Sequence, residues 1–420
     1  MALDRRLRDG LRDASSATPD LPADAVVHSV VVRGRRRRMA RRLRIAFLVL
    51  AAIVAVAAIS PRVLDEIRSW ERPRPATLPP SGLSIITTVA GTGTAGSPGD
   101  GGPATEAVLG YPVDLGFDAQ GNLYIMELDW PGVVRKVDAL GQITTVVGPG
   151  APGEAGDIVL ARTFGPTGLA VDPGGNVYVT GGEGGFTENR VIRVAPSGDV
   201  TTVAGTGVPG FSGDGGPATE AKVTNIWDVA VDAEGNLYIA ASARIRKVDA
   251  NGIITTLAGT GTKGFSGDGG QADEAQVDRV TGVTADASGT AYFIDYGNDR
   301  IRRIDANGVI TTIAGPGEGL ACFSGDGGPA TEASFCGPEH LAVDAGGNIY
   351  VADTLNHRIR MIDAQGIVTT IAGAGRQGFS GDGGPALKAQ PSEPSGVAVG
   401  PDGMIYIADS GNNRVRAVSV

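Results

Sequence analysis

A heptapeptide close to Gly-Phe-Ser-Gly-Asp-Gly-Gly recurs through this chain about every 55 residues. Each copy follows a segment of β-branched residues that contains a Thr-Thr pair. The pairs begin at Thr87, Thr144, Thr201, Thr255, Thr311 and Thr369. A period of this length with β-type content is typical of propellers and solenoids. A residue present in every repeat is expected to hold the architecture, so function is expected where the repeats differ.

One repeat reads as four short strands. In the fifth repeat these are 340–344, 348–353, 358–363 and 367–372, and turns containing glycine separate the first two and the last two. Their β-branched and aromatic residues favour strands. Four antiparallel strands in one repeat describe one propeller blade.

The order of these segments predicts how the ring closes. The first three strands occur six times, and the last set ends at Val420 without a fourth strand. An unpaired fourth strand at 83–89 precedes the first set. We therefore expect an all-β, six-bladed propeller in which the N-terminal strand completes the last blade and removes both exposed edges.

The repeats resemble the NHL-repeat family, on two stretches above all. One is Asn348-Ile-Tyr-Val-Ala-Asp353 with Asn356 and Arg358, and the other is Tyr406-Ile-Ala-Asp409 with Asn412, Arg414 and Arg416. The resemblance covers 83–420, and the Ser-Gly-Asp-Gly-Gly-Pro-Ala insert looks like the bacterial, membrane-anchored branch and the related teneurin-type propellers. It implies a six-bladed propeller. It implies no single activity, because the family holds protein-, RNA- and ligand-binding modules and has relatives with lyase or lactonase activity.

Charge divides the chain. Residues 1–44 hold 12 Arg and 5 Asp, whereas residues 83–420 hold 20 Lys and Arg against 38 Asp and Glu. Binding of a phosphate backbone needs concentrated positive charge. The acidic propeller therefore argues against nucleic acid as a partner.

An apolar segment separates the two charged parts. Residues 45–59 are apolar throughout, and the segment extends to 64 if Pro61 and Arg62 lie at a membrane interface. A membrane helix needs about 20 residues, with a range of about 17–25. The arginines before it place the N-terminal side in the cytoplasm and the propeller outside. We expect a cytoplasmic tail at 1–44, a transmembrane signal anchor at 45–64, a Pro-rich linker at 65–82 and the propeller at 83–420. The alternative is a signal peptide cleaved after Ala55-Val-Ala57.

Cys322 and Cys336 are the only cysteines and flank one copy of the insert. Outside the cytoplasm, two cysteines that close a short loop indicate a disulfide. The alternative is two free thiols.

The repeated acidic residues have a structural interpretation. Each insert offers one aspartate, whereas a calcium loop of the EF-hand type needs several oxygen ligands. These aspartates are Asp100, Asp214, Asp268, Asp326 and Asp382. We expect them to accept backbone N–H bonds within their own turns. We likewise expect Asp295, Asp353 and Asp409 to pair with Arg300, Arg358 and Arg414 across their hairpins.

The residue that opens the innermost strand differs among the repeats. It is Asp114, Gly168, Asp228, Gly282, His340 and Gly396 from the first repeat to the sixth. Innermost strands line the channel, so Asp114, Asp228 and His340 are expected on alternate blades around one channel mouth, beside Trp227 and Glu339. Two carboxylates and an imidazole are ligands for a divalent metal. The alternative is a wet, polar channel mouth without a metal.

These observations favour a binding module over an enzyme. Long loops are expected on the face of the channel mouth, with the inserts among them, and long loops mark an interaction side. Candidate contacts are Trp227, Trp130, Tyr111, Phe211, Phe265, Phe323 and Phe379. The four phenylalanines precede the inserts, and for them we favour the alternative of packing beneath each insert. We expect a membrane-anchored, extracytoplasmic, non-enzymatic module that binds a protein or a cell-envelope glycan. The alternative is a metal-dependent lyase or lactonase-like hydrolase with its site at the channel mouth.

Overall fold

The computed structural model describes residues 84–97, 99–129, 132–153, 155, 168–180, 189–316 and 322–420. The predicted tail, membrane segment and linker, at 1–82, lie outside the described residues. Within the described ranges no helix is long and apolar enough to cross a membrane.

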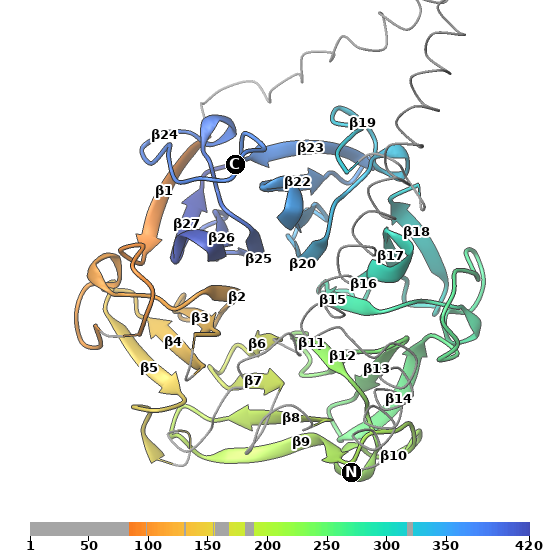
Figure 1. Cartoon of the computed structure of the whole chain (residues 1–420). Coiled ribbons are helices and arrows are strands. Elements are labelled where there is room, and N and C mark those ends of the chain that lie inside the picture. Colours follow the sequence, from red (N-terminus) through yellow and green to blue (C-terminus); the bar gives the residue numbers. More distant parts are fainter. Residues whose placement is uncertain are drawn as a thin grey trace, which may run out of the picture. The chain divides into compact units, whose positions relative to one another are not determined.

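The described strands form six antiparallel sheets arranged as the blades of a ring (Figure 1). Within each blade the strands are given from the channel outwards. Blade one holds β2 (Pro112–Phe117), β3 (Leu123–Glu127), β4 (Val133–Val137) and β5 (Ile143–Val147). Blade two holds β6 (Leu169–Val171), β7 (Val177–Thr180), β8 (Asn189–Val194) and β9 (Val200–Gly207). Blade three holds β11 (Ile226–Val231), β12 (Leu237–Ala241), β13 (Arg244–Val248), β14 (Ile253–Ala258) and β10 (Gly216–Pro217).

The other three blades repeat this order. Blade four holds β15 (Val280–Ala285), β16 (Ala291–Asp295), β17 (Arg300–Ile304) and β18 (Ile310–Ala314). Blade five holds β20 (Pro338–Val343), β21 (Ile349–Asp353), β22 (Arg358–Ile362), β23 (Ile367–Ala372) and β19 (Gly328–Pro329). Blade six holds β25 (Pro394–Val399), β26 (Ile405–Asp409), β27 (Arg414–Val418), β1 (Ile85–Ala90) and β24 (Gly384–Pro385). The six-bladed, all-β prediction is confirmed.

The N-terminal strand closes the ring. β1 runs antiparallel to β27, with Ile86 opposite Val418 and Thr87 opposite Ala417. The first described strand thus lies in the same sheet as the last strands of the chain (Figure 1). The predicted closure is confirmed, and it stabilises the ring because neither end of the chain leaves an unpaired blade edge.

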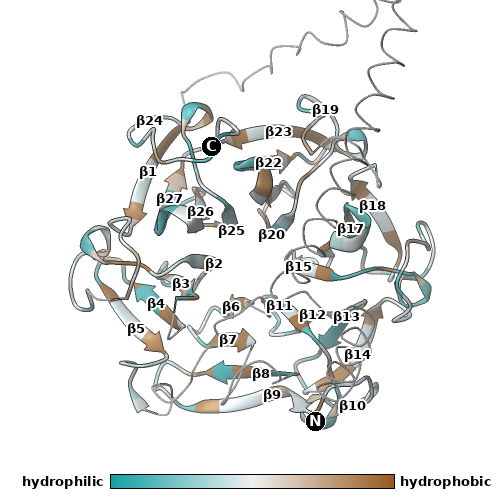
Figure 2. Cartoon of the chain, in the orientation of Figure 1, coloured by the Kyte–Doolittle hydropathy of each residue, from teal (hydrophilic) through white to brown (hydrophobic). Residues whose placement is uncertain are grey.

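The hydrophobic core lies between neighbouring blades. Tyr238 and Ile245 of blade three, for example, pack with Val283 and Phe293 of blade four. The middle strands read as apolar runs because both faces of each sheet are covered by the adjacent blades. The strands carry most of the hydrophobic colour in Figure 2, and the third strands β4, β8 and β13 also show hydrophilic segments, in keeping with the arginines in their sequences.

An aspartate shapes the turn between the first and second strands of a blade. In blade one Asp118 Oδ1 accepts the backbone N–H of Gln120 and of Asn122, and Oδ2 accepts the Tyr124 hydroxyl at 3.0 Å. Gly121 completes the turn with a φ of 81°, a conformation that glycine adopts without steric cost. Such turns let strands of five or six residues follow one another with little connecting chain.

The inserts meet the hairpins between the second and third strands and extend from there to the rim of the propeller, which had not been predicted. β10, β19 and β24 each pair with the outermost strand of a blade, namely β14, β23 and β1. An outermost strand otherwise presents unpaired backbone groups to solvent, and covering it prevents edge-to-edge association. Short 3-10 helices end the inserts, at Ala104–Glu106, Ala218–Glu220, Ala272–Glu274, Ala330–Glu332 and Ala386–Lys388. Others lie in the hairpins between second and third strands, at Tyr296–Asn298, Thr354–Asn356 and Ser410–Asn412.

Candidate functional site

The residues at the start of the innermost strands alternate between glycine and a larger residue around the ring, and this alternation has a packing cause. A Cβ on Gly168 would lie 2.6 Å from Asp228 Cα, and a Cβ on Gly396 would lie 2.5 Å from the Val113 carbonyl oxygen. Real Cβ atoms do not approach backbone so closely. Every second blade must therefore carry glycine at this position, which leaves room for one side chain on each of the other three blades.

Asp114 and Asp228 hold neighbouring blades together. Asp114 accepts the N–H of Leu115 at 2.7 Å within its own blade and the N–H of Leu169 at 2.8 Å in blade two. Asp228 makes the equivalent bonds, to Val229 and to Val283 of blade four. Both carboxylates are buried, so these N–H groups fix the direction in which their remaining lone pairs point.

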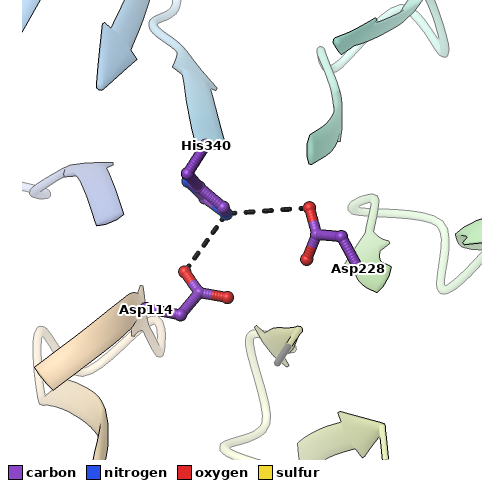
Figure 3. Close-up of side chains that lie close together, drawn as sticks. All are labelled: Asp114, Asp228 and His340. Atoms are coloured by element: carbon purple, nitrogen blue, oxygen red, sulfur yellow. Dashed lines mark ion pairs between the residues drawn. The ribbon is translucent and has the colours of Figure 1, made fainter. Parts of the chain in front are cut away.

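His340 completes a convergent set with the two aspartates (Figure 3). Its Nδ1 lies 3.2 Å from the Val397 carbonyl oxygen, which requires Nδ1 to carry the proton. Its Nε2 lies 3.1 Å from Asp114 Oδ1 and 3.8 Å from Asp228 Oδ2. One ligand atom from each of the three residues lies within 4.8 Å of the others. The structure thus brings together the three residues that the sequence placed on alternate blades.

Burial and charge shift the protonation of this set. Burial raises the pKa of Asp114, against the opposing effect of His340, and burial with the nearby Asp114 raises the pKa of Asp228 to about 7. Burial alone would lower the pKa of His340, but the carboxylates of Asp114 and Asp228 outweigh it and raise the pKa. The set therefore holds protons near neutral pH, or a cation in their place.

The geometry suits a divalent metal ion. With bonds of about 2.1 Å, ligand atoms around one ion stand about 3 to 3.5 Å apart. The distances of 3.1 and 3.8 Å from His340 Nε2 are near this range, and the ligand atoms all lie within 4.8 Å of one another. Histidine ligands usually donate their other ring N–H to a carbonyl or carboxylate, as His340 does to Val397, and ligating carboxylates are themselves hydrogen-bonded. The same arrangement also suits an imidazolium held by two carboxylates, so the residues present fit either occupant.

The other predicted channel residues lie at different depths. Trp227 is half-buried and Glu339 is exposed in the strands that carry Asp228 and His340. Partial desolvation and Glu393 raise the pKa of Glu339 to about 7. Desolvation also raises the pKa of Tyr111, which is exposed and has left-handed backbone geometry with a φ of 52°. Trp130 lies outside the described residues.

The four phenylalanines of the inserts stack on arginines. Each ring faces the guanidinium of the first residue of a third strand, at 3.6 to 3.9 Å from the ring centroid. The pairs are Phe211 with Arg244, Phe265 with Arg300, Phe323 with Arg358 and Phe379 with Arg414. Phe211, Phe265 and Phe379 nonetheless remain 40 to 48% exposed. These rings therefore pack against the arginines below them and also present apolar area to solvent.

The aspartates of the inserts bind buried arginines, a role that the sequence analysis missed. Asp326 Oδ1 lies 2.8 Å from an Nη of Arg360, and Asp326 Oδ2 accepts the Thr370 hydroxyl at 2.6 Å. The same pairing joins Asp100 to Arg135, Asp214 to Arg246, Asp268 to Arg302 and Asp382 to Arg416. Each aspartate thus fastens its insert to the third strand of the blade, whereas backbone bonds within the turn had been expected.

The hairpin aspartates pair with the same arginines. Asp353 stands opposite Arg358 in the strand register, as expected, but its ion pair is with Arg360 at 3.7 Å. Its Oδ1 accepts the N–H of Cys336 and its carboxylate accepts the Asn356 amide. Glu127, Asp295 and Asp409 pair with Arg135, Arg302 and Arg416 in the same way. In blades four, five and six the hairpin aspartate thus forms its ion pair with the second arginine of the third strand, whereas the first arginine had been predicted.

Cys322 and Cys336 form a disulfide in the structure. It closes the insert that precedes blade five. The Asn356 amide donates to the Cys322 carbonyl at 2.6 Å, so both ends of the bridged loop are held by the hairpin that carries Asp353.

Comparison with known protein families gives a match to the teneurin NHL domain. The model of this domain matches residues 199–266, 261–322, 315–378 and 375–419, which together are more than half of the chain. Teneurin-1 of Gallus gallus is 32% identical over 253 residues, and teneurin-4 of Mus musculus is 29% identical over 380 residues, or 80% of this chain. The chain spans only 9% and 13% of the lengths of these two relatives.

Solved structures share the fold. An auxiliary nutrient binding protein from Bacteroides thetaiotaomicron VPI-5482 is 16% identical, with a TM-score of 0.57 over 80% of this chain and 76% of that chain. A second auxiliary nutrient binding protein, from Bacteroides ovatus ATCC 8483, is 18% identical, with a TM-score of 0.57 over 81% of this chain and 77% of that chain. At these identities the likeness concerns the fold alone.

Proposed function

The chain belongs to the teneurin NHL domain family, and from that premise we propose that its propeller is a non-enzymatic binding module for a protein or a cell-envelope glycan. The module is held outside the cytoplasm by the membrane segment at 45–64, with the arginine-rich tail inside. The acidic propeller makes nucleic acid an unsuitable partner.

One observation carries this proposal, namely the exposed aromatic and apolar side chains on the face of the propeller at which the innermost strands begin. Tyr111 precedes an innermost strand, Leu355 lies in the hairpin after β21, and the phenylalanines stack on the arginines that begin the third strands. Aromatic residues and arginine are enriched in protein interfaces, and aromatic rings in fixed positions lose little entropy on binding. Each Phe–Arg stack presents such a ring already held in place.

The test uses the full chain in detergent, immobilised through its N-terminal tail. Solubilised envelope proteins and purified envelope glycan are applied separately. We expect one of them to be retained, and Tyr111→Ala and Leu355→Ala to weaken its binding about tenfold or more, the loss of a contact worth about 1.4 kcal/mol. Leu140→Ala is the matched control, because Leu140 is 84% exposed in the turn between β4 and β5. Equal loss in this control, or no retention at all, contradicts the proposal.

A second candidate is a metal-dependent lyase or hydrolase, favoured by the convergence of Asp114, Asp228 and His340. These residues would hold the ion, which when bound would supply a polarising positive charge and a metal-bound water. The Val397 carbonyl keeps the Nε2 lone pair of His340 directed into the channel, and the backbone N–H groups of Leu169 and Val283 orient the two carboxylates.

Metal analysis of the purified full chain distinguishes this candidate. Stoichiometric metal that is lost in Asp228→Asn and His340→Gln, and kept in Glu339→Gln, supports it. Glu339 is the control because its exposed carboxylate is not among the convergent ligand atoms. If the chain holds no metal and both ligand variants bind the envelope partner normally, the metal-dependent enzyme is rejected and the binding module is retained.

A further inference from the structure

Blade three differs from blades one, four, five and six at the hairpin between its second and third strands. Strand register places Ala241 opposite Ile226, at the position that Asp353 occupies opposite Pro338. The hairpin is also shorter, because Ala241 pairs directly with Arg244 whereas Asp353 pairs with Arg358. Blade three therefore lacks both the hairpin acid and the residues that hold it.

The missing acid leaves a buried arginine with one partner. Arg246 is 1% exposed, and within the described part of the chain Asp214 is the one acid that pairs with it. The equivalent arginines of four other blades, Arg135, Arg302, Arg360 and Arg416, each pair with two acids, one from the insert and one from the hairpin. The Nε of Arg246 has no hydrogen-bond partner, which is equally true of Arg135 and Arg302, so the difference in blade three is the absent second acid.

The charge around Arg246 is unbalanced as a result. Arg244 lies over Phe211, and burial together with the nearby Arg246 lowers the pKa of Arg244. In blade five, by contrast, two arginines face two aspartates. Two arginines and one aspartate leave blade three with an excess of one positive charge, where the corresponding cluster of blade five is neutral.

A cavity of about 280 Å³ occupies the same place. It is lined by Gly210, Phe211, Val223, Thr224, Ala241, Ser242, Arg244 and Arg246. Its walls therefore combine apolar groups with the two guanidinium groups. Arginine is the side chain best suited to grip a carboxylate, since its fork offers parallel N–H donors to the two oxygens.

We propose that this cavity is a carboxylate-binding site that receives an Asp or Glu side chain of a partner polypeptide. The carboxylate of the incoming side chain takes the position that Asp353 fills in blade five. The methylene groups of that side chain pack against Phe211, Val223 and Ala241. A polypeptide side chain fits these walls better than a uronic acid, because a sugar ring would bring several hydroxyl groups against apolar surface. The inference rests on the proposed binding function and assigns one contact within it.

The test measures binding of N-acetyl-glutamate N-methylamide to the full chain, by ligand-observed NMR. N-acetyl-glutamine N-methylamide and glucuronate are compared at the same concentrations. We expect the glutamate probe to bind at least about tenfold more tightly than the glutamine probe, and more weakly as salt is raised, because the contact is between opposite charges. Ala241→Asp supplies the missing acid from within the chain and should abolish binding. Lys388→Gln removes an exposed positive charge that is not among the lining residues, and should leave binding unchanged.

Three results overturn the proposal. Equal binding of the glutamine probe, or none by the wild-type chain, removes the carboxylate site. Binding that survives in Ala241→Asp places the probe elsewhere. Tighter binding of glucuronate than of the glutamate probe rejects a polypeptide as the source. Retention of the envelope partner is measured separately on the same variants. The two measurements can therefore reject the carboxylate site while the proposed binding function holds, or reject the binding function while the site holds.

Discussion

The buried guanidinium of Arg360 and the carboxylate of Asp326 join the third strand of blade five to the insert before it, with two arginine nitrogens within 3.1 Å of one Asp326 oxygen. The pair recurs in blades one, three, four and six. In blade two, Ile192 stands in the register position of Arg360, and the junction at 150–157 lacks the Gly-Asp-Gly-Gly motif. Insert aspartate and buried arginine therefore occur together and are absent together.

Asp326→Asn is expected to lower the free energy of unfolding by about 2 kcal/mol. The change leaves the charge of Arg360 buried with one acid, and hydrogen bonds to charged groups contribute about 1.5 to 3 kcal/mol each. Urea unfolding of the propeller measures the loss. Asp273→Asn is the control, because Asp273 is exposed and no ion pair is found for it among the described residues. A surface change of this kind stays within about 0.5 kcal/mol. Equal effects in the two variants would mean that the insert contributes no stability through Arg360.

Gly396→Ala is expected to destabilise the propeller by about 3 kcal/mol, the upper end of the range for overpacked sites. The new Cβ would meet backbone atoms of the next blade, the Val113 carbonyl oxygen and Asp114 Cα, which cannot move without opening the ring. Gly102→Ala is the matched control, since the nearest atom to its Cβ lies 3.6 Å away. Thermal unfolding followed by circular dichroism compares them. Retention of full stability by Gly396→Ala would show that the inner strands can separate.

The repeat allowed most of the architecture to be predicted. Alternation of strands and glycine turns gave the blades, and the unpaired segment near Leu83 gave the closure by β1. The convergence of Asp114, Asp228 and His340 could be expected for the same reason, since equivalent positions in a closed ring face one axis. The pairing of the inserts with the outermost strands was not predicted, because a loop sequence does not state which strand edge it covers.

The ion pairs were less predictable. Asp353 and Arg358 are opposite one another in the sheet, and sequence spacing gives this register correctly. The side chain of Asp353 nevertheless reaches diagonally to Arg360, a choice that depends on strand twist and on the insert above it. The exception in blade three, where Ala241 leaves Arg246 with one acid, becomes visible only when these diagonal pairs are known.

The unfolding free energy is expected to rise by about 1 kcal/mol or more as the pH falls from 7.5 to 5. Burial raises the pKa of Glu127 to about 7, and that of Asp353 and Asp409 to about 6, and it outweighs the lowering effect of hydrogen bonds and of the arginine beside each carboxylate. These pKa values exceed those of the unfolded chain, so the folded state takes up protons first as the pH falls. The resulting stability is complete below about pH 4 and is lost as the pH rises through 6 to 7.

Urea unfolding at several pH values measures this trend, with Glu127→Gln as the matched variant. That variant should show a shallower change between pH 6 and 7.5, because it removes one of the groups that take up a proton there. Asp118 and Asp344 have pKa values below the ordinary range, so their contribution is lost only below about pH 4 and does not oppose the trend. His357 opposes it, since burial lowers its pKa. Stability that is constant or falls over this interval contradicts the prediction.

The disulfide between Cys322 and Cys336 is expected to stabilise the propeller and to report its compartment. With 14 residues of separation, the loop entropy that the bridge removes from the unfolded chain is worth about 3 kcal/mol, so Cys322→Ser/Cys336→Ser should lose about that much. The proposed extracytoplasmic location supplies the oxidising conditions that the bond needs. In intact cells an alkylating reagent should therefore label neither cysteine until a reductant is added. Labelling of both without reductant would place the propeller in a reducing compartment, and the proposed orientation of the membrane segment would then be wrong.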